Sequence, residues 1–452
     1  MIDKRLVAAL LLSTLAAPPV SRAERANPRP GASLRAADLL TLKKRFGRFS
    51  DSLPDVSQLG MGKILAYEEN RFFVFVMGNG GAVLRRVVFL KPATFVVDDQ
   101  VCGPARWRLH ASKAPDVKGR RVQIAEGDAR ILCEALLPKD AAVTTSRGGD
   151  HVVEVAPRGK TDEVRFLHVL HVGGKDSPVP KWDLSAKAGV LRVKVAAGGR
   201  TCELTLPPGP ARTGTIAVAG ADGKAILEKR LLPAGILPHG EKGVAMLERW
   251  DRPYRHGRRP GWGTGRPATE LIKAVEAGTI RPGRAIVLGC GTGTNPVYLA
   301  RKGFDVTAVD LAPAALIHAE AKARKAGVRV RWLVADVLAM PPLKPFDFLF
   351  DRGCYHHVRR YNAAGFVEMA RRLTHPGSQF LILAGSAKET RRYGPPRVKE
   401  SEIRGDFSAL FDFQHLRDIR FDTRNPGGKG PMAWSILLRR KDETKPSSKK
   451  PL

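Results

Sequence analysis

The sequence is poor in cysteine and has no long apolar segment. Its 452 residues include five cysteines, Cys102, Cys133, Cys202, Cys290 and Cys354, and none of them form a Cys-x-x-Cys pair. This sparse, odd set argues against a disulfide framework and predicts no metal site, although one bridge among the first three remains open. No apolar run reaches the roughly 18–20 residues needed to cross a bilayer, which excludes a multi-pass membrane protein.

Acidic residues are also scarce. There are 44 Asp and Glu against 76 Lys and Arg, a net charge of +32. The excess is spread along the chain, with 37 basic against 23 acidic residues in 1–240 and 39 against 21 in 241–452. A nucleic-acid-binding face would concentrate this charge, so we expect a generally basic surface and no nucleic-acid partner.

The two ends of the chain predict segments outside the folded domains. Residues 1–23 resemble a signal peptide, since Lys4 and Arg5 precede an apolar stretch and Ser21-Arg22-Ala23 offers a cleavage site. Cleavage would place the protein in an exported or periplasmic location; otherwise it would be cytoplasmic, and a buried helix is the alternative. Residues 441–452 are expected to form a basic, disordered tail.

Two folded regions are expected between these ends. Residues 61–238 contain short apolar or alternating runs separated by glycine turns, which predicts an antiparallel β-sandwich. Residues 239–262 are rich in Pro, Gly and Arg and are expected to form a linker. Helical and strand patterns then alternate over 263–440, as in a Rossmann-like α/β fold with a mostly parallel sheet.

The first region resembles the C-terminal β-sandwich of the heparinase II/III family. The resemblance rests on Arg85–Pro92 with Phe95–Asp98, on Trp107–His110, and on Leu136-Leu137-Pro138. It implies a glycan as a partner of the sandwich. The lyase cleft also needs a long helical domain, for which fewer than 70 residues precede the sandwich, so an incomplete site is expected. Four histidines are candidate relics of that site or ordinary strand residues: His110, His151, His168 and His171.

The second region opens with a strand that runs directly into a glycine-rich turn. Residues 284–288 are followed by Gly289-Cys290-Gly291-Thr292-Gly293 and then by a helix. Glycines allow a ligand to approach the backbone closely, and the helix offers free N–H groups. The next strand ends at Asp310, 21 residues after Gly289, where a carboxylate can bind both ribose hydroxyls of an adenosine.

This arrangement resembles motif I of class I S-adenosylmethionine-dependent methyltransferases. A nicotinamide-binding site would instead show Gly-x-Gly-x-x-Gly. Two later strand ends match the family, Ala335-Asp336-Val337 at the adenine position and Phe346–Asp351 at motif IV. The resemblance implies S-adenosyl-L-methionine as cofactor, bound by Gly289, Cys290, Gly291, Gly293, Asp310, Leu311, Asp336, Val337 and Asp351. Cys290 and Cys354 are also expected to be small buried fillers.

Flanking segments resemble the thiopurine and tellurite methyltransferase group. Asp351-Arg352-Gly353 matches its Asp-Arg-Gly loop, and Trp250–Tyr254 with Gly261–Pro267 matches its Trp- and Gly-rich segment. The resemblance implies that Trp262 covers the cofactor and that Thr264 and Arg266 reach its methionine carboxylate. Packing of Trp262 on the first helix is the alternative.

The acceptor side of the site is expected after the fourth strand. Asp351 and Arg352 would face the methyl group, and Arg352, Arg359 or Arg360 would hold an anionic acceptor. His356 or His357 would accept a proton, unless the pair simply begins a helix. Together these residues predict methyl transfer to a small-molecule thiol or chalcogen oxyanion. A glycan-binding protein with a degenerate methyltransferase domain and a nucleic-acid methyltransferase are the alternatives.

Overall fold

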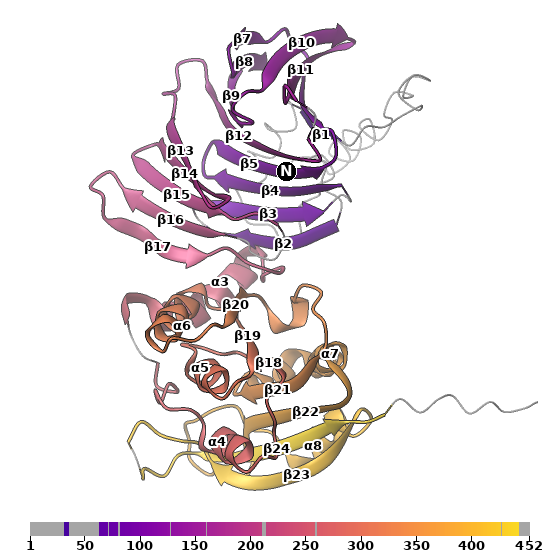
Figure 1. The fold of residues 1–452 in the computed structure, drawn as a ribbon. Coiled ribbons are helices and arrows are strands. Elements are labelled where there is room, and N and C mark those ends of the chain that lie inside the picture. Colours follow the sequence, from indigo (N-terminus) through magenta and orange to yellow (C-terminus); the bar gives the residue numbers. More distant parts are fainter. Residues whose placement is uncertain are drawn as a thin grey trace, which may run out of the picture.

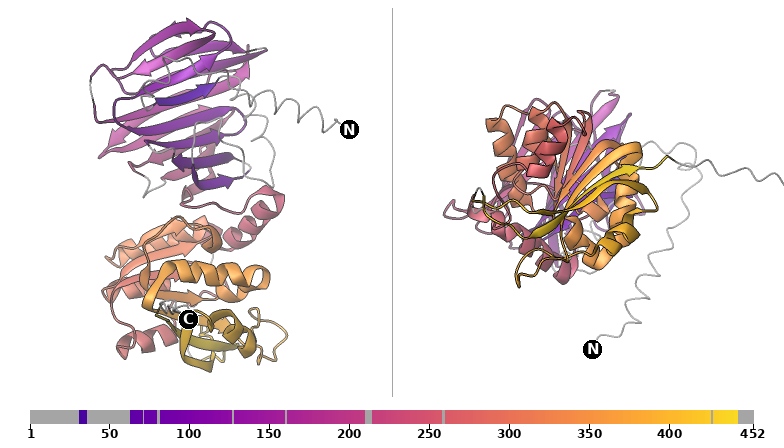
Figure 2. Two further views of the ribbon diagram at one scale, coloured as in Figure 1. Left: turned by 90° about the vertical axis from the view of Figure 1, so that its right-hand side faces the viewer. Right: turned by 90° about the horizontal axis from the view of Figure 1, so that it is seen from below.

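The protein consists of a β-rich part followed by a part with both helices and strands. The computed structural model describes residues 31–35 and 63–442, apart from 71, 80–81, 127, 160, 210–213, 258–259 and 426. Figures 1 and 2 show the two parts stacked end to end, with helix α3 (Gly240–Asp251) where they meet. The signal-like segment 1–23 and most of the expected tail lie outside the described residues. No helix within the described ranges has the length and apolar character that a bilayer crossing requires.

Three sheets make up the described β-rich part. An eight-stranded sheet has the order β2-β3-β4-β5-β12-β9-β8-β7, a five-stranded sheet runs from β13 to β17, and a four-stranded sheet has the order β1-β6-β11-β10. All neighbouring pairs are antiparallel except β1 and β6. The strands are β1 (Gly31–Arg35), β2 (Lys63–Glu69), β3 (Phe73–Asn79), β4 (Val83–Leu90), β5 (Thr94–Cys102), β6 (Arg106–Ala111), β7 (Asp116–Lys118), β8 (Arg121–Glu126), β9 (Ala129–Leu137), β10 (Ala142–Gly148), β11 (Asp150–Ala156), β12 (Glu163–Gly174), β13 (Lys181–Lys187), β14 (Val190–Ala197), β15 (Arg200–Leu206), β16 (Thr215–Gly220) and β17 (Ala225–Leu231). The expectation of an antiparallel, β-rich region is therefore confirmed.

The eight-stranded sheet is apolar on both faces. On one face Phe89 belongs to a buried cluster with Trp107 of the four-stranded sheet. On the other face Phe75 belongs to a cluster with Val193 and Leu204 of the five-stranded sheet. Burial on both faces explains why the central strands read as continuous apolar runs rather than as alternating patterns.

Buried charges link neighbouring strands of the large sheet. Arg85 of β4 donates two hydrogen bonds to Asp99 of β5, at 2.6 and 2.7 Å. Asp98 accepts from both Arg86 and Arg165, at 2.9 and 2.7 Å. Four of these five side chains are at most 1% exposed, with Arg165 at 17%. Pairing compensates part of the cost of removing these charges from water.

The four histidines singled out in this region do not form one cluster. His168 is fully buried and stacks on Trp107, with ring centroids 3.7 Å apart. Burial lowers the pKa of His168 to about 3, so it is neutral. His171 contacts Thr94 through Nδ1 at 3.0 Å, while His110 and His151 lie on β6 and β11. The buried pair therefore contributes to the packing of the sheet.

The second part is built on a seven-stranded sheet. Its order is β20-β19-β18-β21-β22-β24-β23, with β24 antiparallel to both neighbours and the other adjacent pairs parallel. The strands are β18 (Arg284–Leu288), β19 (Asp305–Asp310), β20 (Arg331–Val334), β21 (Phe346–Arg352), β22 (Thr374–Gly385), β23 (Phe411–Arg420) and β24 (Met432–Arg440). The expected α/β fold is confirmed, with the four strands expected before the glycine turn, Asp310, Asp336 and Asp351.

Helices cover both faces of this sheet. Leu271, Leu299 and Leu316 pack on one face from three different helices, and Phe366 and Ile403 pack on the other face from two more. The helices are α4 (Thr269–Glu276), α5 (Thr294–Arg301), α6 (Pro313–Lys325), α7 (Tyr355–Leu373) and α8 (Glu400–Phe407), with the short 3-10 helices η3 (Arg252–Gly257) and η4 (Val337–Ala339). The carboxyl ends of the parallel strands are thereby left as the edge at which loops gather (Figure 1).

The segment expected to be a linker, 239–262, contains regular structure. Its first half forms α3, and η3 follows at once. Leu247 of α3 packs into the core of the α/β part, together with Leu271 and Leu299. The content of Pro, Gly and Arg predicts a linker. It does not reveal the helix, because a single apolar contact such as that of Leu247 changes the composition very little.

Candidate active site

A glycine turn joins β18 to α5 at the carboxyl edge of the sheet. Gly289, Gly291 and Gly293 have φ values of 57°, 53° and 75°, in the left-handed region that favours glycine. A Cβ at position 289 would lie 2.9 Å from the Cβ of Cys354, and one at 293 would lie 2.6 Å from that of Ala319. Glycine is therefore required here both by conformation and by space, and the turn leaves its backbone accessible to a ligand.

Asp310 ties this turn to the end of β19. Its carboxylate accepts from the backbone N–H of Gly291 at 2.7 Å and from that of Ala312 at 2.8 Å. Burial raises the pKa of Asp310 to about 6, against the opposing effect of these two hydrogen bonds. A half-buried Leu311 follows it. The carboxylate thus lies beside the turn, where a ribose would approach.

Asp336 occupies the corresponding place after β20. It caps η4 by accepting from the N–H of Leu338 at 2.9 Å, and burial raises its pKa. Val337 behind it is buried in the core. Asp310 and Asp336 therefore follow adjacent parallel strands at the same edge of the sheet.

Asp351 accepts hydrogen bonds from the backbone at the start of α7. It is fully buried, and its two oxygens accept from the backbone N–H groups of Gly353, Cys354 and Tyr355, at 3.0, 3.1 and 2.9 Å. Burial raises its pKa to about 7. The expected contact with a reacting group competes with these three hydrogen bonds, so this geometry favours a role in shaping the loop.

Arg352 binds the backbone of the loop that carries Trp262. Its guanidinium donates to the carbonyl of Trp262 at 3.2 Å and to that of Asp422 at 3.4 Å, and it lies over the ring of Phe421 at 5.2 Å. Trp262 in turn donates from Nε1 to the hydroxyl of Tyr254 at 2.9 Å. The side chain of Trp262 is 50% exposed.

Tyr254 was not predicted as a site residue. Its hydroxyl lies 3.4 Å from where a Cβ at Gly291 would stand and accepts from Nε1 of Trp262, so Tyr254 lies against the glycine turn and connects Trp262 to it. The sequence resemblance includes the Trp250–Tyr254 segment. That segment lies far from the glycine turn in the sequence, so nothing indicated that its tyrosine contacts the turn.

Thr264 and Arg266 stabilise the loop that carries Trp262. The Thr264 hydroxyl donates to the carbonyl of Arg266 at 2.8 Å and accepts from its N–H at 3.1 Å. The Arg266 guanidinium donates to the carbonyl of Thr423 at 2.8 Å. Both residues therefore lie in the loop that carries Trp262, and their polar groups form hydrogen bonds with backbone atoms.

The two histidines are neutral at physiological pH. Burial, with the neighbouring His357 and Arg352, lowers the pKa of His356 to about 3, and burial lowers that of His357 to about 4. His356 accepts the N–H of Gly385 through Nδ1 at 2.9 Å, which leaves Nε2 as its protonated nitrogen. His357 packs edge-on against Trp250, with centroids 4.8 Å apart. His356 thus has a structural hydrogen bond where a general base would need a free lone pair.

Arg359 and Arg360 differ in environment. Arg359 donates to Asp406 at 2.7 Å and to Glu402 at 3.0 Å, so two carboxylates of α8 neutralise it. Arg360 is exposed on α7. The structure therefore does not bring these arginines together with Arg352 as one anion-binding group.

Both cysteines of the site are protonated thiols. Burial raises the pKa values of Cys290 and Cys354 well above their usual range, and nearby Asp310 adds to the shift. Neither thiol is a nucleophile in this form. In addition, the part of the chain that the structure describes holds no group of His, Cys, Asp and Glu side chains suited to a metal ion.

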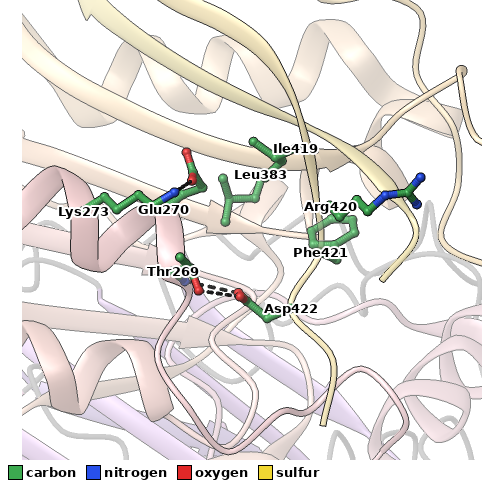
Figure 3. Close-up of a pocket in the computed structure, with 8 residues that line it drawn as sticks. All are labelled: Thr269, Glu270, Lys273, Leu383, Ile419, Arg420, Phe421 and Asp422. Atoms are coloured by element: carbon green, nitrogen blue, oxygen red, sulfur yellow. Dashed lines mark hydrogen bonds and ion pairs between the residues drawn. The ribbon is translucent and has the colours of Figure 1, made fainter. Parts of the chain in front are cut away.

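A cavity of about 270 Å³ lies between α4 and the ends of β22 and β23, and Phe421 and Asp422 form part of its wall (Figure 3). Asp422 accepts from both the hydroxyl and the N–H of Thr269, at 2.5 and 3.1 Å. Charged and apolar side chains mix in the remaining wall: Glu270, Lys273, Leu383, Ile419 and Arg420. This cavity shares a wall with the Arg352 contacts, and its volume suits a small molecule.

Comparison with known proteins places this site in a class. A family model described as a methyltransferase domain matches residues 285–377, which include the glycine turn and the three acidic strand ends. The chain is 28% identical over 183 residues to 2-heptyl-1-hydroxyquinolin-4(1H)-one methyltransferase of Mycobacteroides abscessus, covering 40% of this chain and 80% of that protein. It is 27% identical over 149 residues to probable thiol methyltransferase 2 of Arabidopsis thaliana, covering 32% of this chain and 65% of that protein.

Solved methyltransferase structures also match, at low identity. The N-methyltransferase NodS from Bradyrhizobium japonicum WM9, in complex with S-adenosyl-L-homocysteine, matches with a TM-score of 0.32 and 14% identity, covering 38% of this chain and 84% of that one. The carboxyl-terminal part of this chain is a methyltransferase domain. The protein is an S-adenosylmethionine-dependent methyltransferase, and S-adenosyl-L-methionine is its cofactor.

Proposed function

We propose that the protein methylates a small acceptor that reaches the site already nucleophilic, a thiol or a chalcogen oxyanion. The observation that carries this proposal is the lack of a suitable base among the described residues at the site. His356 has its Nδ1 occupied, His357 has a pKa of about 4, and the Asp351 oxygens accept three backbone N–H groups. His357 is too weak a base to remove a proton from a neutral hydroxyl, and the acceptor atoms of His356 and Asp351 are occupied, so an ionised or soft nucleophile suits the site better.

The cofactor contacts in this proposal follow the strand ends. Asp310 takes the ribose hydroxyls, Asp336 and Val337 take the adenine, and the backbone of the glycine turn lies along the cofactor. The cofactor supplies the methyl group as an electrophile. Trp262 and Tyr254 exclude water above it, and Arg352 keeps Trp262 in place while the acceptor is oriented from the side of Phe421.

Two relatives are compatible with a small acceptor. One is named for a hydroxyquinolone substrate and the other for thiols. The 270 Å³ cavity adds a space of suitable size, and its wall includes Phe421 and Asp422, which Arg352 contacts. For the β-rich part, a glycan ligand and a heparinase-like sandwich remain hypotheses based on the sequence resemblance.

The decisive experiment measures tritiated methyl transfer from S-adenosylmethionine to a panel of acceptors at several pH values. The panel contains aliphatic and aromatic thiols of different pKa, selenite, tellurite, RNA and DNA. If the acceptor must arrive ionised, the inflection in kcat/KM will follow the pKa of each thiol, and His357→Gln will leave it unchanged. An inflection at one fixed pH for every thiol, lost in His357→Gln, would show an enzymatic base instead. Labelling of RNA or DNA alone would refute the small-acceptor proposal.

A further inference from the structure

Helix α3 is fixed at its start by the β-rich part. Its first residue, Gly240, donates its N–H to Oε1 of Glu69 at 2.6 Å, and no side chain of the preceding His239 caps the helix. Glu69 belongs to β2 and is 1% exposed, and its other oxygen accepts from the hydroxyl of Tyr67 at 3.1 Å. A residue 171 positions earlier in the chain thus supplies the cap that the local sequence lacks.

The connection just before α3 joins the two parts as well. Tyr67 donates its N–H to the carbonyl of Gly235 at 3.2 Å and accepts from the N–H of Leu237 at 3.0 Å. The next link is to β20, where the N–H of Ala234 donates to the carbonyl of Val334 at 2.9 Å. The chain entering α3 therefore has strand-like contacts to both parts, which restricts where the helix can begin.

The other end of α3 is fixed to α6. Asp251, the last residue of α3, accepts from the N–H of Ala314 at 2.7 Å, in the first turn of α6. Its second oxygen accepts from Arg255 at 2.9 Å. Asp251 is 6% exposed, and a carboxylate at this helix N-terminus is electrostatically favourable. The helix is consequently held between β2 and α6 by one buried carboxylate at each end.

The residues that cover the glycine turn extend directly from this helix. Tyr254 follows Asp251 by three residues, and its carbonyl accepts from Nε2 of His318 on α6 at 2.8 Å. Trp250, within α3, contacts the ring of Trp262 edge-on, with centroids 6.1 Å apart. We define Trp250, Tyr254 and Trp262 as the aromatic cover. A shift of α3 would move two members of the cover and remove the hydroxyl to which the third is bonded.

We propose that Glu69 and Asp251 are positioning residues for cofactor binding, which they support by holding α3 and hence the aromatic cover over the glycine turn. The β-rich part thereby contributes to the affinity of the methyltransferase part for its cofactor, without touching it. This inference rests on the proposed placement of the cofactor under Tyr254 and Trp262.

The test uses the full chain and S-adenosylhomocysteine as the probe, with isothermal titration calorimetry. Loss of one helix cap predicts a Kd about 3- to 30-fold higher for Glu69→Ala and for Asp251→Ala. Asp251→Asn keeps an oxygen that can accept from Ala314 and should recover most of the affinity. Glu154→Ala is the matched control, because Glu154 pairs with Arg106 and Arg108 on an outer sheet and makes no contact with α3.

A double-mutant cycle separates positioning from a general loss of stability. Tyr254→Phe removes the hydroxyl that accepts from Trp262 and weakens binding through the cover alone. If Glu69 acts through the cover, the effect of Glu69→Ala will be smaller in the Tyr254→Phe background than in the wild type. Fully additive effects, or wild-type affinity in both alanine variants, would overturn the inference. If one alanine variant fails to fold, the same cycle with the other alanine variant, together with hydrogen exchange over residues 252–262, decides the question. Absence of probe binding by the wild-type chain would instead count against the proposed cofactor placement.

Discussion

At the scale of single residues, the site depends on carboxylates that serve the backbone and a ligand together. Asp310 shows this most clearly, since its oxygens already accept from Gly291 and Ala312. Its pKa of about 6 lies above the usual value of about 3.9 for an unfolded chain. The folded protein therefore binds this proton more tightly than the unfolded one. Ionised Asp310 lowers stability above pH 6, and that cost disappears as the pH falls from 6 towards 4.

Cofactor affinity should depend on pH in the opposite sense. In the proposed placement of the cofactor, ionised Asp310 would make charge-assisted hydrogen bonds to ribose, so the affinity for S-adenosylhomocysteine should fall as the pH drops below about 6. Asp310→Asn should weaken binding at pH 7.5 by about 1–3 kcal/mol and abolish this pH dependence. Titration calorimetry between pH 5 and 8 measures both effects, with Glu400→Gln, half-buried at the start of α8, as control. An unchanged pH profile in Asp310→Asn would assign the titration to another group.

At the scale of elements, the loop after β21 is organised by a cap. The residue before α7 is Cys354, whose side chain makes no cap hydrogen bond, and Asp351 supplies the acceptors instead. This explains why a carboxylate at a strand end need not face the reaction. The sequence analysis predicts only a ligand-facing role for Asp351, although strand-end acids can bind ligands or cap the helices that follow.

Removing this cap should cost stability before it costs chemistry. Asp351→Ala removes the acceptor of the Cys354 and Tyr355 N–H groups, whereas the N–H of Gly353 keeps its bond to the Leu383 carbonyl, and we expect a loss of about 2 kcal/mol or more in the free energy of unfolding. Asp351→Asn keeps one acceptor oxygen and should lie between the alanine variant and the wild type. Urea denaturation followed by circular dichroism measures the change, and hydrogen exchange over residues 353–358 locates it. Normal stability together with lost turnover in Asp351→Ala would show that this residue acts on the acceptor.

At the scale of the whole molecule, the sequence predicted what depends on neighbours in the chain. The glycine turn, Asp310 and Asp336 could be recognised because strand, turn and acid follow one another at fixed spacing. Tyr254 and Glu69 could not, because their partners Gly291 and Gly240 lie 37 and 171 residues away. The partners of Arg352 and Arg359 could not be predicted either, because they come from distant segments. They are backbone carbonyls for Arg352 and acidic side chains for Arg359. The linker was predicted from composition alone. Composition cannot show that Glu69, on a remote strand, caps α3.

The buried ion pairs of the large sheet should determine how well the β-rich part holds its shape. Asp99→Ala leaves Arg85, which is 1% exposed, without its two-point partner, and we expect a loss of about 3–5 kcal/mol in the free energy of unfolding. The double variant Arg85→Met with Asp99→Leu removes both charges and should cost much less. Thermal unfolding followed by tryptophan fluorescence, which includes buried Trp107, measures the difference. Equal losses in the single and double variants would mean that packing volume, rather than an uncompensated charge, sets the cost. Because β2 of this sheet carries Glu69, unfolding of the β-rich part in Asp99→Ala should also release the cap on α3 and lower cofactor affinity at the same temperature.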